Sequence, residues 1–333
     1  MKRTTTPARR ALLGAAAIAL AGLAALPGTA AADSYPSKAV RLIIPFPAGG
    51  VTDLVGRLLA EKLTTAWGQT VVVENRAGAS GMIGADYVAK SQPDGYTLML
   101  SSTAEVAINQ NLYAKMSYSP EKDLAPVTLA ATTPVVLVTN PALGVHSLEE
   151  LKKLGKQKPG TINFASAGSG GVQHMAGALL ETKLQIGLVH VPYRGGAPSV
   201  MDLLAGHVDT AMASAPLVVQ YIHDKKLIGL AVAADKRMAS LPDVPTANEA
   251  LSTTGFEISN WYGIFAPAGT PADILDKINA DIVAALKTPE LQQKISEAGA
   301  EPVGNSRKEF TDFWHAEIKK YADIIRESGA KVD

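Results

Sequence analysis

The chain has 333 residues, 31 basic and 31 acidic side chains, and no cysteine. This composition excludes a basic surface for nucleic acid or for an anionic membrane. It also excludes disulfides, thiol nucleophiles and thiolate metal ligands. Hydrophobic residues make up 47% of the chain and aromatic residues only 5%, so we expect a buried core but no cleft lined by stacked rings. A chain of this length is expected to form two domains.

The first 32 residues have the pattern of an export signal. Four basic residues precede an uncharged apolar run at 11–26, and alanines at 30–32 offer small residues for cleavage. The run is too short to span a membrane, so we expect a cleavable signal peptide at 1–32 and a periplasmic mature protein beginning near Asp33. The paired Arg9 and Arg10 leave the twin-arginine route open beside general secretion. Cleavage removes four basic groups and no acidic one, which leaves 27 basic and 31 acidic side chains.

A strand, a glycine turn and a helix open the mature chain. Val40–Ile44 is an apolar run typical of a buried strand, and Pro45–Asp53 follows it with adjacent glycines. Backbone N–H groups at the start of a helix, together with the helix dipole, bind anions without a basic side chain. The alternative is an ordinary turn between a strand and a helix. Five residues are predicted to form the inward face of the helix: Leu54, Val55, Leu58, Leu59 and Leu63.

Further strands alternate with helices along the chain. They are predicted at 70–74, 96–100, 124–140, 161–165, 227–233 and 258–267. This alternation indicates an α/β fold in which helices flank mainly parallel sheets. Ligands of such sheets lie beyond the carboxyl ends of the strands. The turn at 48–50, a glycine-rich loop at 76–78 and the strand end at 101–103 all belong to that edge.

The second half of the chain repeats features of the first. A shift of 121 residues places Gly49-Gly50-Val51 on Gly170-Gly171-Val172 and gives eight identities over positions 49–63. A shift of 118 places Arg76 on Arg194. We infer two similarly wound lobes, each presenting a glycine-rich helix start to a shared cleft. The predicted limits are 33–133 plus 263–333 for lobe 1 and 134–262 for lobe 2, with crossover strands near 127–138 and 258–267.

Short motifs that carry a family resemblance span the mature chain. They are Tyr35-Pro36, Pro45–Asp53 with Arg57, Glu74–Gly81, Asp94–Leu98, Trp261–Gly263 and Pro267–Pro271. In this order they resemble the Bug family, the periplasmic solute-binding subunits of tripartite tricarboxylate transporters. The resemblance implies a two-lobed type II periplasmic-binding-protein fold (a Venus flytrap) that closes on its ligand. It also implies a small organic acid as ligand, held by backbone groups and water from the two glycine-rich loops.

The candidate ligand-binding residues lie in these loops and strand ends. They offer backbone donors, hydroxyls, an imidazole, a guanidinium and an apolar wall. The set is Phe46, Ala48, Gly49, Gly50, Asp53, Ser101, Ser102, Thr103, Ser166, Gly168, Ser169, Gly170, His174, Tyr193, Arg194 and Ser214. Each serine or threonine has the alternative role of a turn or capping residue.

Asp53 and His174 stand at matching positions in the two helix starts. Asp53 either fixes its loop by accepting from the N–H groups or organises bound water beside the ligand. His174 is expected to donate to a second carboxylate or to a bridging water. Arg194 is the guanidinium expected to reach the cleft, while Arg76 either pairs with the ligand or holds its own loop.

Other kinds of site fit the sequence less well. A serine hydrolase needs Gly-x-Ser-x-Gly, whereas the residues up to Ser169 read Ala-Ser-Ala-Gly-Ser from position 165. His190 and His207 have no ligand-like spacing to His174, so neither a metal nor a cofactor is expected. An effector-sensing domain of a regulator shares the two-lobed fold, but the export signal and the absence of a DNA-binding segment argue against it.

The sequence therefore predicts a monomeric, non-enzymatic periplasmic protein. It would bind a dicarboxylate, a tricarboxylate, an acidic amino acid or an aromatic acid, and it would not bind nucleic acid. The resemblance implies delivery of this ligand to the membrane subunits of a tripartite tricarboxylate-type transporter. The alternative is a ligand sensor or an orphan binding protein in the same compartment.

Overall fold

Ten strands and the helices between them make up the described part of the chain. A computed structural model describes residues 35–331, so the expected signal peptide at 1–32 lies outside the described residues. The strands are β1 Val40–Ile44, β2 Val71–Asn75, β3 Thr97–Ser102, β4 Leu124–Thr139, β5 Asn163–Ser166, β6 Val189–Pro192, β7 Thr210–Ser214, β8 Ile228–Val232, β9 Ser259–Pro267 and β10 Glu301–Pro302.

Helices connect most of these strands. The α-helices are α2 Val51–Trp67, α3 Met82–Ala89, α4 Asn109–Leu112, α5 Pro120–Asp123, α6 Leu148–Gln157, α7 Val172–Leu184, α8 Gly196–Ala205, α9 Val219–His223, α10 Ala247–Leu251, α11 Ala272–Leu286, α12 Pro289–Glu297 and α13 Arg307–Ser328. Short helical turns are η1 Ala79–Gly81, η3 Pro141–Leu143 and η4 Ala215–Leu217, which are 3₁₀, and η2 Ala104–Ile108, which is a π-helix.

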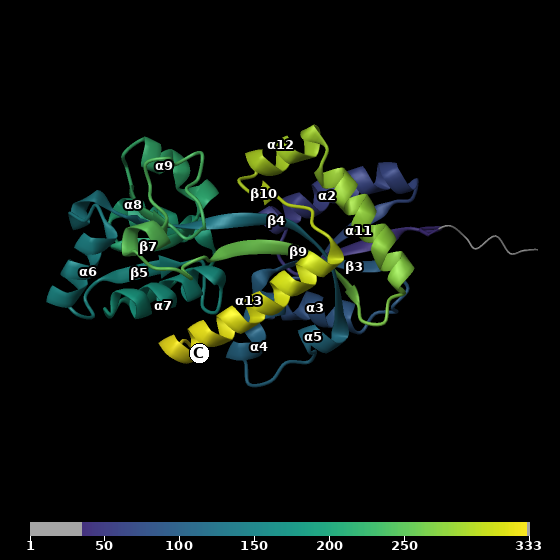
Figure 1. The fold of residues 1–333 in the computed structure, drawn as a ribbon, viewed down its shortest axis with the longest axis horizontal. Coiled ribbons are helices and arrows are strands. Elements are labelled where there is room, and N and C mark those ends of the chain that lie inside the picture. The colour runs from purple at the N-terminus through teal and green to yellow at the C-terminus, as the bar shows by residue number, and fades with distance from the viewer. Residues whose placement is uncertain (1–34, 332–333) are drawn as a thin grey trace, which may run out of the picture. The chain divides into compact units, whose positions relative to one another are not determined.

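The long strand β4 belongs to two sheets. Its first part pairs with β9 and its last part with β7 and β8, all antiparallel. β1 is parallel to β2 and β3, and β5 is parallel to β6 and β7. The predicted α/β alternation is confirmed: β4 and β9 join two mainly parallel halves (Figure 1). We call the half built on β1–β3 lobe 1 and the half built on β5–β8 lobe 2; the residue limits given above stay a prediction.

Parallel pairing sets where the loops emerge. The carboxyl ends of β1, β2 and β3 share one edge of lobe 1, and those of β5, β6 and β7 share one edge of lobe 2. The turn at 45–50 and the loop at 76–81 leave from the first edge. The loops at 167–171 and 193–195 leave from the second. Ligands of parallel sheets bind beyond such edges.

Helix α2 packs on lobe 1 with a face slightly different from the predicted one. Val55, Leu59 and Leu63 are buried as expected, but Leu54 is 42% exposed, so its predicted inward position is wrong. Gly56 takes the inward place, where a Cβ would contact the Ile44 side chain. Because Gly56 has no side chain, α2 can lie close to β1, and the buried face turns away from Leu54.

The last helix, α13, packs on both lobes (Figure 1). The Trp314 indole donates to the carbonyl of Val106 in η2 at 2.8 Å. The core cluster that contains Trp314 and Tyr321 of α13 also contains Met175 and Leu180 of α7. A second cluster covers the other face of the lobe 2 sheet under α8 and α9. The largest core is therefore continuous between the lobes, which the sequence did not indicate.

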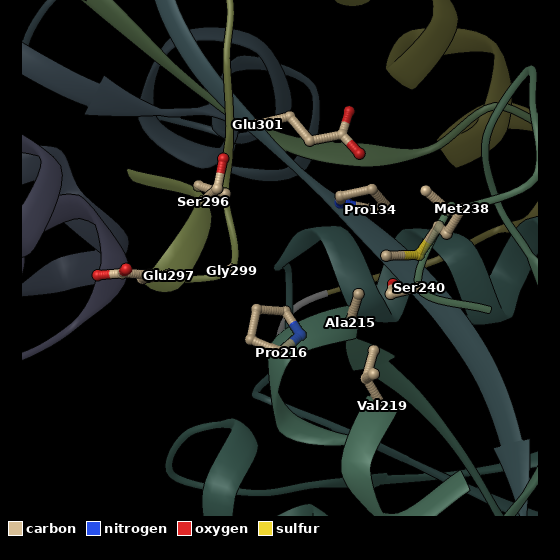
Figure 2. A pocket seen from close by; sticks show the side chains of 12 residues that line it. Pro134, Ala215, Pro216, Val219, Met238, Ser240, Ser296, Glu297, Gly299 and Glu301 are labelled. Atoms are coloured by element: carbon tan, nitrogen blue, oxygen red, sulfur yellow. The ribbon is translucent and has the colours of Figure 1, made fainter. Parts of the chain in front are cut away.

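A cavity of about 410 Å³ lies where the two lobes meet beside β4 (Figure 2). Pro134 of β4 and Pro216 of η4 line it from one side, and the turn between α12 and β10 closes it from lobe 1. In that turn Gly299 has φ +75° and lies so close to Pro216 that a Cβ on Gly299 would overlap the proline ring. This contact joins a turn of lobe 1 to the segment after β7 of lobe 2.

Replacement of Gly299 by alanine tests this contact. An alanine at positive φ costs roughly 1–2 kcal/mol by itself, and overpacking adds about 1–3 kcal/mol. Gly255→Ala is the matched control, because Gly255 has φ +80° and open space around its Cα. In urea unfolding, Gly299→Ala should lose clearly more stability than Gly255→Ala. Equal losses would show that the turn and Pro216 separate without cost.

Candidate ligand-binding site

Asp53 holds the first glycine turn together. One carboxylate oxygen accepts from the Gly49 N–H at 3.0 Å and from Arg57 Nε at 2.9 Å. The other accepts from Asn75 Nδ2 at 2.9 Å, and the same amide nitrogen donates to the carbonyl of Phe46 at 3.0 Å. The side chain is only 4% exposed. Of the two predicted roles for Asp53, this geometry favours fixing the loop.

The charge of Asp53 is secured by its donors. The hydrogen bond from Arg57 is the largest influence, and the bonds from Gly49 and Asn75 add to it. Together they lower the pKa of Asp53 to about 2, although burial acts in the opposite direction. The start of α2 therefore already contains a carboxylate that is balanced by Arg57.

His174 holds the second glycine turn in the same way. Its Nδ1 accepts from the Gly170 N–H at 3.1 Å, so the hydrogen of the neutral ring is on Nε2. The ring stacks on His190 with centroids 3.9 Å apart, and His190 in turn stacks on Phe164. His190 Nε2 lies 2.7 Å from Ser166 Oγ, and that hydroxyl also hydrogen-bonds to the backbone of Gly168.

Burial keeps both imidazoles neutral. It lowers the pKa of His174. Burial and then the neighbouring His174 lower the pKa of His190 to about 4. An ionised His174 would present an N–H to the Gly170 N–H, so the turn depends on the neutral ring. His174 stands out in the sequence but its partner does not, because only the pairing of β6 with β5 brings His190 to it.

The two turns have the same backbone geometry. Gly50 and Gly171 precede their helices with φ/ψ of −82°/171° and −81°/173°. The preceding glycines, Gly49 and Gly170, have φ of +91° and +77°, a region that L-residues with side chains rarely occupy. In each turn that glycine donates to the side chain four residues later. The repeat inferred from the sequence is thus visible in the backbone as well.

Neither helix start is capped by a side chain. The starts of α6, α10 and α13 are capped by Ser147, Thr246 and Ser306. Within the described residues, the N–H groups of Gly50, which precedes α2, and of Val51, its first residue, make no hydrogen bond, and neither do those of Gly171 and Val172 at α7. Uncapped N–H groups at the positive end of a helix dipole are the usual donors to anions.

The second pair of loops matches as well, one residue away from the predicted register. Gly78 precedes η1 with φ/ψ of 131°/156°, and Gly195 precedes α8 with 116°/167°. The backbones thus correspond at a shift of 117 residues. Arg76 pairs with Glu74 at 3.1 Å and lies over the Tyr87 ring at 3.6 Å, so it holds its own loop.

The end of β3 is largely engaged inside lobe 1. Ser101 and Thr103 are fully buried. Ser101 Oγ donates to the carbonyl of Gly263 at 3.1 Å, and Thr103 Oγ1 accepts from the Trp261 N–H at 3.0 Å. These two hydroxyls therefore fasten β3 to β9. Ser102 is 5% exposed and hydrogen-bonds to Glu105, a residue that the sequence analysis did not single out.

The remaining candidates differ in how freely they face solvent. Ala48, Ser169 and Arg194 are exposed. The Tyr193 hydroxyl donates to Asp202 at 2.7 Å, and Ser214 Oγ accepts from Gln173 at 3.1 Å. Exposed groups on the edge of lobe 2 are thus available to a ligand, whereas Tyr193 is tied to α8.

The described residues contain no group of three or more histidine, cysteine, aspartate or glutamate side chains that could hold a metal ion. Among the same residues we find no helix long and apolar enough to cross a membrane.

Two sheets joined by β4 and β9, with uncapped helix starts at the carboxyl edges of both, define a two-lobed solute-binding protein of the periplasmic type. A family model described as the tripartite tricarboxylate transporter family receptor, TctC, matches residues 55–330. The chain belongs to this family, whose members are periplasmic binding proteins. The resemblance to the Bug family and the predicted type II fold are confirmed.

Relatives and solved structures agree with this assignment. BugT of Bordetella pertussis is 39% identical over 316 residues, which are 95% of this chain and 96% of BugT. The structure of R. palustris Rpa4515 with adipate is similar at 33% identity and a TM-score of 0.79, covering 90% of this chain and all of that one. MatC from Rhodopseudomonas palustris with bound malate is similar at 31% identity and a TM-score of 0.75, covering 87% of this chain and all of MatC.

The neutral histidine pair predicts a loss of stability in mild acid. Both pKa values are lower in the folded chain than the ordinary value of 6.5, so the unfolded chain takes up protons first. Stability should therefore fall as the pH drops from about 6.5 toward 4. In His190→Gln, which cannot titrate, the decline should be visibly shallower when melting temperature is measured against pH.

The control for this prediction is His146→Gln, because His146 is exposed. It should follow the wild-type curve over the same pH range. A uniform drop in the melting temperature of His190→Gln, with an unchanged slope, would contradict the role given to the histidine pair.

Proposed function

We propose that this receptor captures a small organic carboxylate between the starts of α2 and α7 and delivers it to a tripartite tricarboxylate-type membrane transporter. The observation that carries the proposal is the pair of uncapped helix starts with matching backbone geometry. Each turn uses the glycine N–H at Gly49 or Gly170 to shape itself and leaves the next N–H groups for a ligand. The similar structures of Rpa4515 with adipate and of MatC with bound malate support an acid of this class.

The number of donors is sufficient for tight binding. Micromolar affinity corresponds to about −8 kcal/mol, and hydrogen bonds to a charged group contribute roughly 1.5–3 kcal/mol each. Two N–H groups at each helix start and one hydroxyl such as Ser169 would contribute roughly 7.5–15 kcal/mol in all, and the upper half of that range corresponds to micromolar binding after an association cost of about 4–7 kcal/mol. Closure of the lobes would exclude water and strengthen every bond.

The two ends of this site are electrostatically different. The start of α2 contains the ionised Asp53 with Arg57, whereas the start of α7 contains the neutral His174. His174 Nε2 carries a hydrogen that can reach a carboxylate or a bridging water, while Asp53 has no donor to offer. A dicarboxylate would therefore lie with its more strongly held end at α7.

Residues 1–32 would direct export by general secretion or the twin-arginine route, and the mature chain would act as a monomer in the periplasm. No observation favours the hydrolase alternative, because His174 is engaged with Gly170 and His190 rather than with Ser169.

A panel of organic acids tests the proposed ligand class. Ligands that bind only the folded state raise stability by mass action, by about 2.7 kcal/mol at a hundredfold excess over Kd. At least one dicarboxylate, tricarboxylate, acidic amino acid or aromatic acid should raise the melting temperature of the mature protein by several degrees. A shift with a sugar or a metal ion, and with none of the acids, would refute the carboxylate proposal.

Leucine at Gly50 or Gly171 tests the two helix starts. Neither glycine has a positive φ, and a Cβ has room at both positions, so the fold should tolerate the change. The side chain would stand over the free N–H groups, and affinity for the acid should fall at least tenfold by calorimetry. Gly187→Leu is the control, because Gly187 is exposed, also has room, and lies between α7 and β6. Unchanged affinity in both site variants would mean that the turns are only structural.

A further inference from the structure

Glu105 is a buried carboxyl group directly behind the end of β3. It is the second residue of the π-helical turn η2, and it has no exposed surface. Its Oε1 lies 2.6 Å from the backbone N of Ser102, and its Oε2 lies 2.8 Å from Ser102 Oγ. No cation pairs with Glu105 among the described residues. π-Helical turns are rare and occur often at functional sites.

The surroundings of Glu105 disfavour a charge. Across η2 pack Trp314 of α13 and Tyr118, whose hydroxyl donates to the carbonyl of Glu105 at 2.6 Å. Burial raises the pKa of the Glu105 carboxyl to about 8, although hydrogen bonds from its own backbone N–H and from Ser102 act in the opposite direction. At neutral pH the group is therefore an uncharged carboxylic acid.

Among the titratable groups described next, Glu105 is the one whose charge is expected to change near pH 8. Tyr118 has its pKa raised by burial, by Glu105 and by Asp86 of α3. The pKa of Asp86, which pairs with Lys90, is lowered. On α13 the uncharged Trp314 donates to the carbonyl of Val106 in η2.

The protonation state of Glu105 determines what Ser102 can do. Oε1 accepts from a backbone N–H, so the acid's hydrogen belongs on Oε2, where it is donated to Ser102 Oγ. Ser102 Oγ also accepts from the Ala104 N–H at 3.4 Å. With both of its acceptor positions filled, the Ser102 hydroxyl keeps its own hydrogen for another partner. If Glu105 is ionised, that hydrogen must be donated to Oε2 instead.

The carboxyl group also contacts the glycine-rich loop. A Cβ on Gly81, the residue before α3, would lie 3.0 Å from Glu105 Oε2. Glu105 is thus enclosed between the end of β3 and the loop that follows β2. Both leave the carboxyl edge of the lobe 1 sheet, where the ligand is proposed to bind.

We propose that Glu105 is a positioning residue that keeps the Ser102 hydroxyl oriented as a hydrogen-bond donor to the bound acid. The inference rests on the proposed function and specifies one donor of that site. It makes binding dependent on a proton: the donor is present while Glu105 is neutral and is withdrawn when Glu105 ionises. Loss of one hydrogen bond to a charged ligand corresponds to a roughly tenfold or greater loss of affinity.

The test measures the Kd of the acid identified in the panel between pH 6 and 9.5 by calorimetry. Wild type should weaken about tenfold as the pH rises through 8. Glu105→Gln should bind as wild type does at pH 6 and keep that affinity at pH 9.5, because its amide donates to Ser102 Oγ permanently. Ser102→Ala should bind weakly at every pH with little slope. Ser102→Ala keeps the carboxyl of Glu105 in place. It therefore still tests the proposal if Glu105→Gln is unstable.

Glu181→Gln is the matched control. Glu181 is a partly buried glutamate on α7 whose pKa is also raised by burial, and it accepts from a backbone N–H at 2.8 Å. This variant should keep the wild-type slope. A flat wild-type profile, or an unchanged slope in Glu105→Gln, would overturn the role of Glu105 alone. Failure of the wild type to bind any acid at any pH would overturn the proposed function as well.

Discussion

The architecture depends on the pairing of one strand along its whole length. The sixteen residues of β4 pair with β9 and β10 in lobe 1 and with β7 and β8 in lobe 2. Backbone hydrogen bonds on both edges fix the register of both sheets to the same strand. The carboxyl edges that carry the glycine turns are therefore positioned by β4 and β9, not by the turns themselves.

At each edge a second constraint operates, because a helix start leaves several N–H groups unsatisfied. Helices α6, α10 and α13 meet that constraint with a serine or threonine cap, whereas α8, α11 and α12 have no side-chain cap. At the starts of α2 and α7, Gly49 and Gly170 each donate to a side chain one helical turn later, Asp53 or His174. That bond shapes the turn and leaves the first N–H groups of the helix uncovered. Each turn is thus held in its shape while its N–H groups stay available to a ligand.

Much of the fold and part of the candidate site could be predicted from local patterns in the sequence. The strand β1 and the helix α2 follow from a short apolar run, two glycines and helical spacing, and the duplicated turn follows from identities that survive between the lobes. Leu54 was misplaced because spacing alone does not distinguish the faces on either side of a small residue such as Gly56. His190 and Glu105 could not be found, since their importance arises from strand pairing and from burial, which no local pattern reveals.

The order of the strands has a consequence for how the chain acquires its structure. β9 lies between β3 and β4, and the paired residues of β9 and β4 are between 125 positions (134 to 259) and 143 positions (124 to 267) apart. In lobe 1, β3 and β4 therefore cannot join in one sheet until β9, which ends at residue 267, has been synthesised. The strands of lobe 2 follow one another without interruption from β5 to β8. Since distant pairings form slowly, we expect the sheet of lobe 1 to be completed after the sheet of lobe 2.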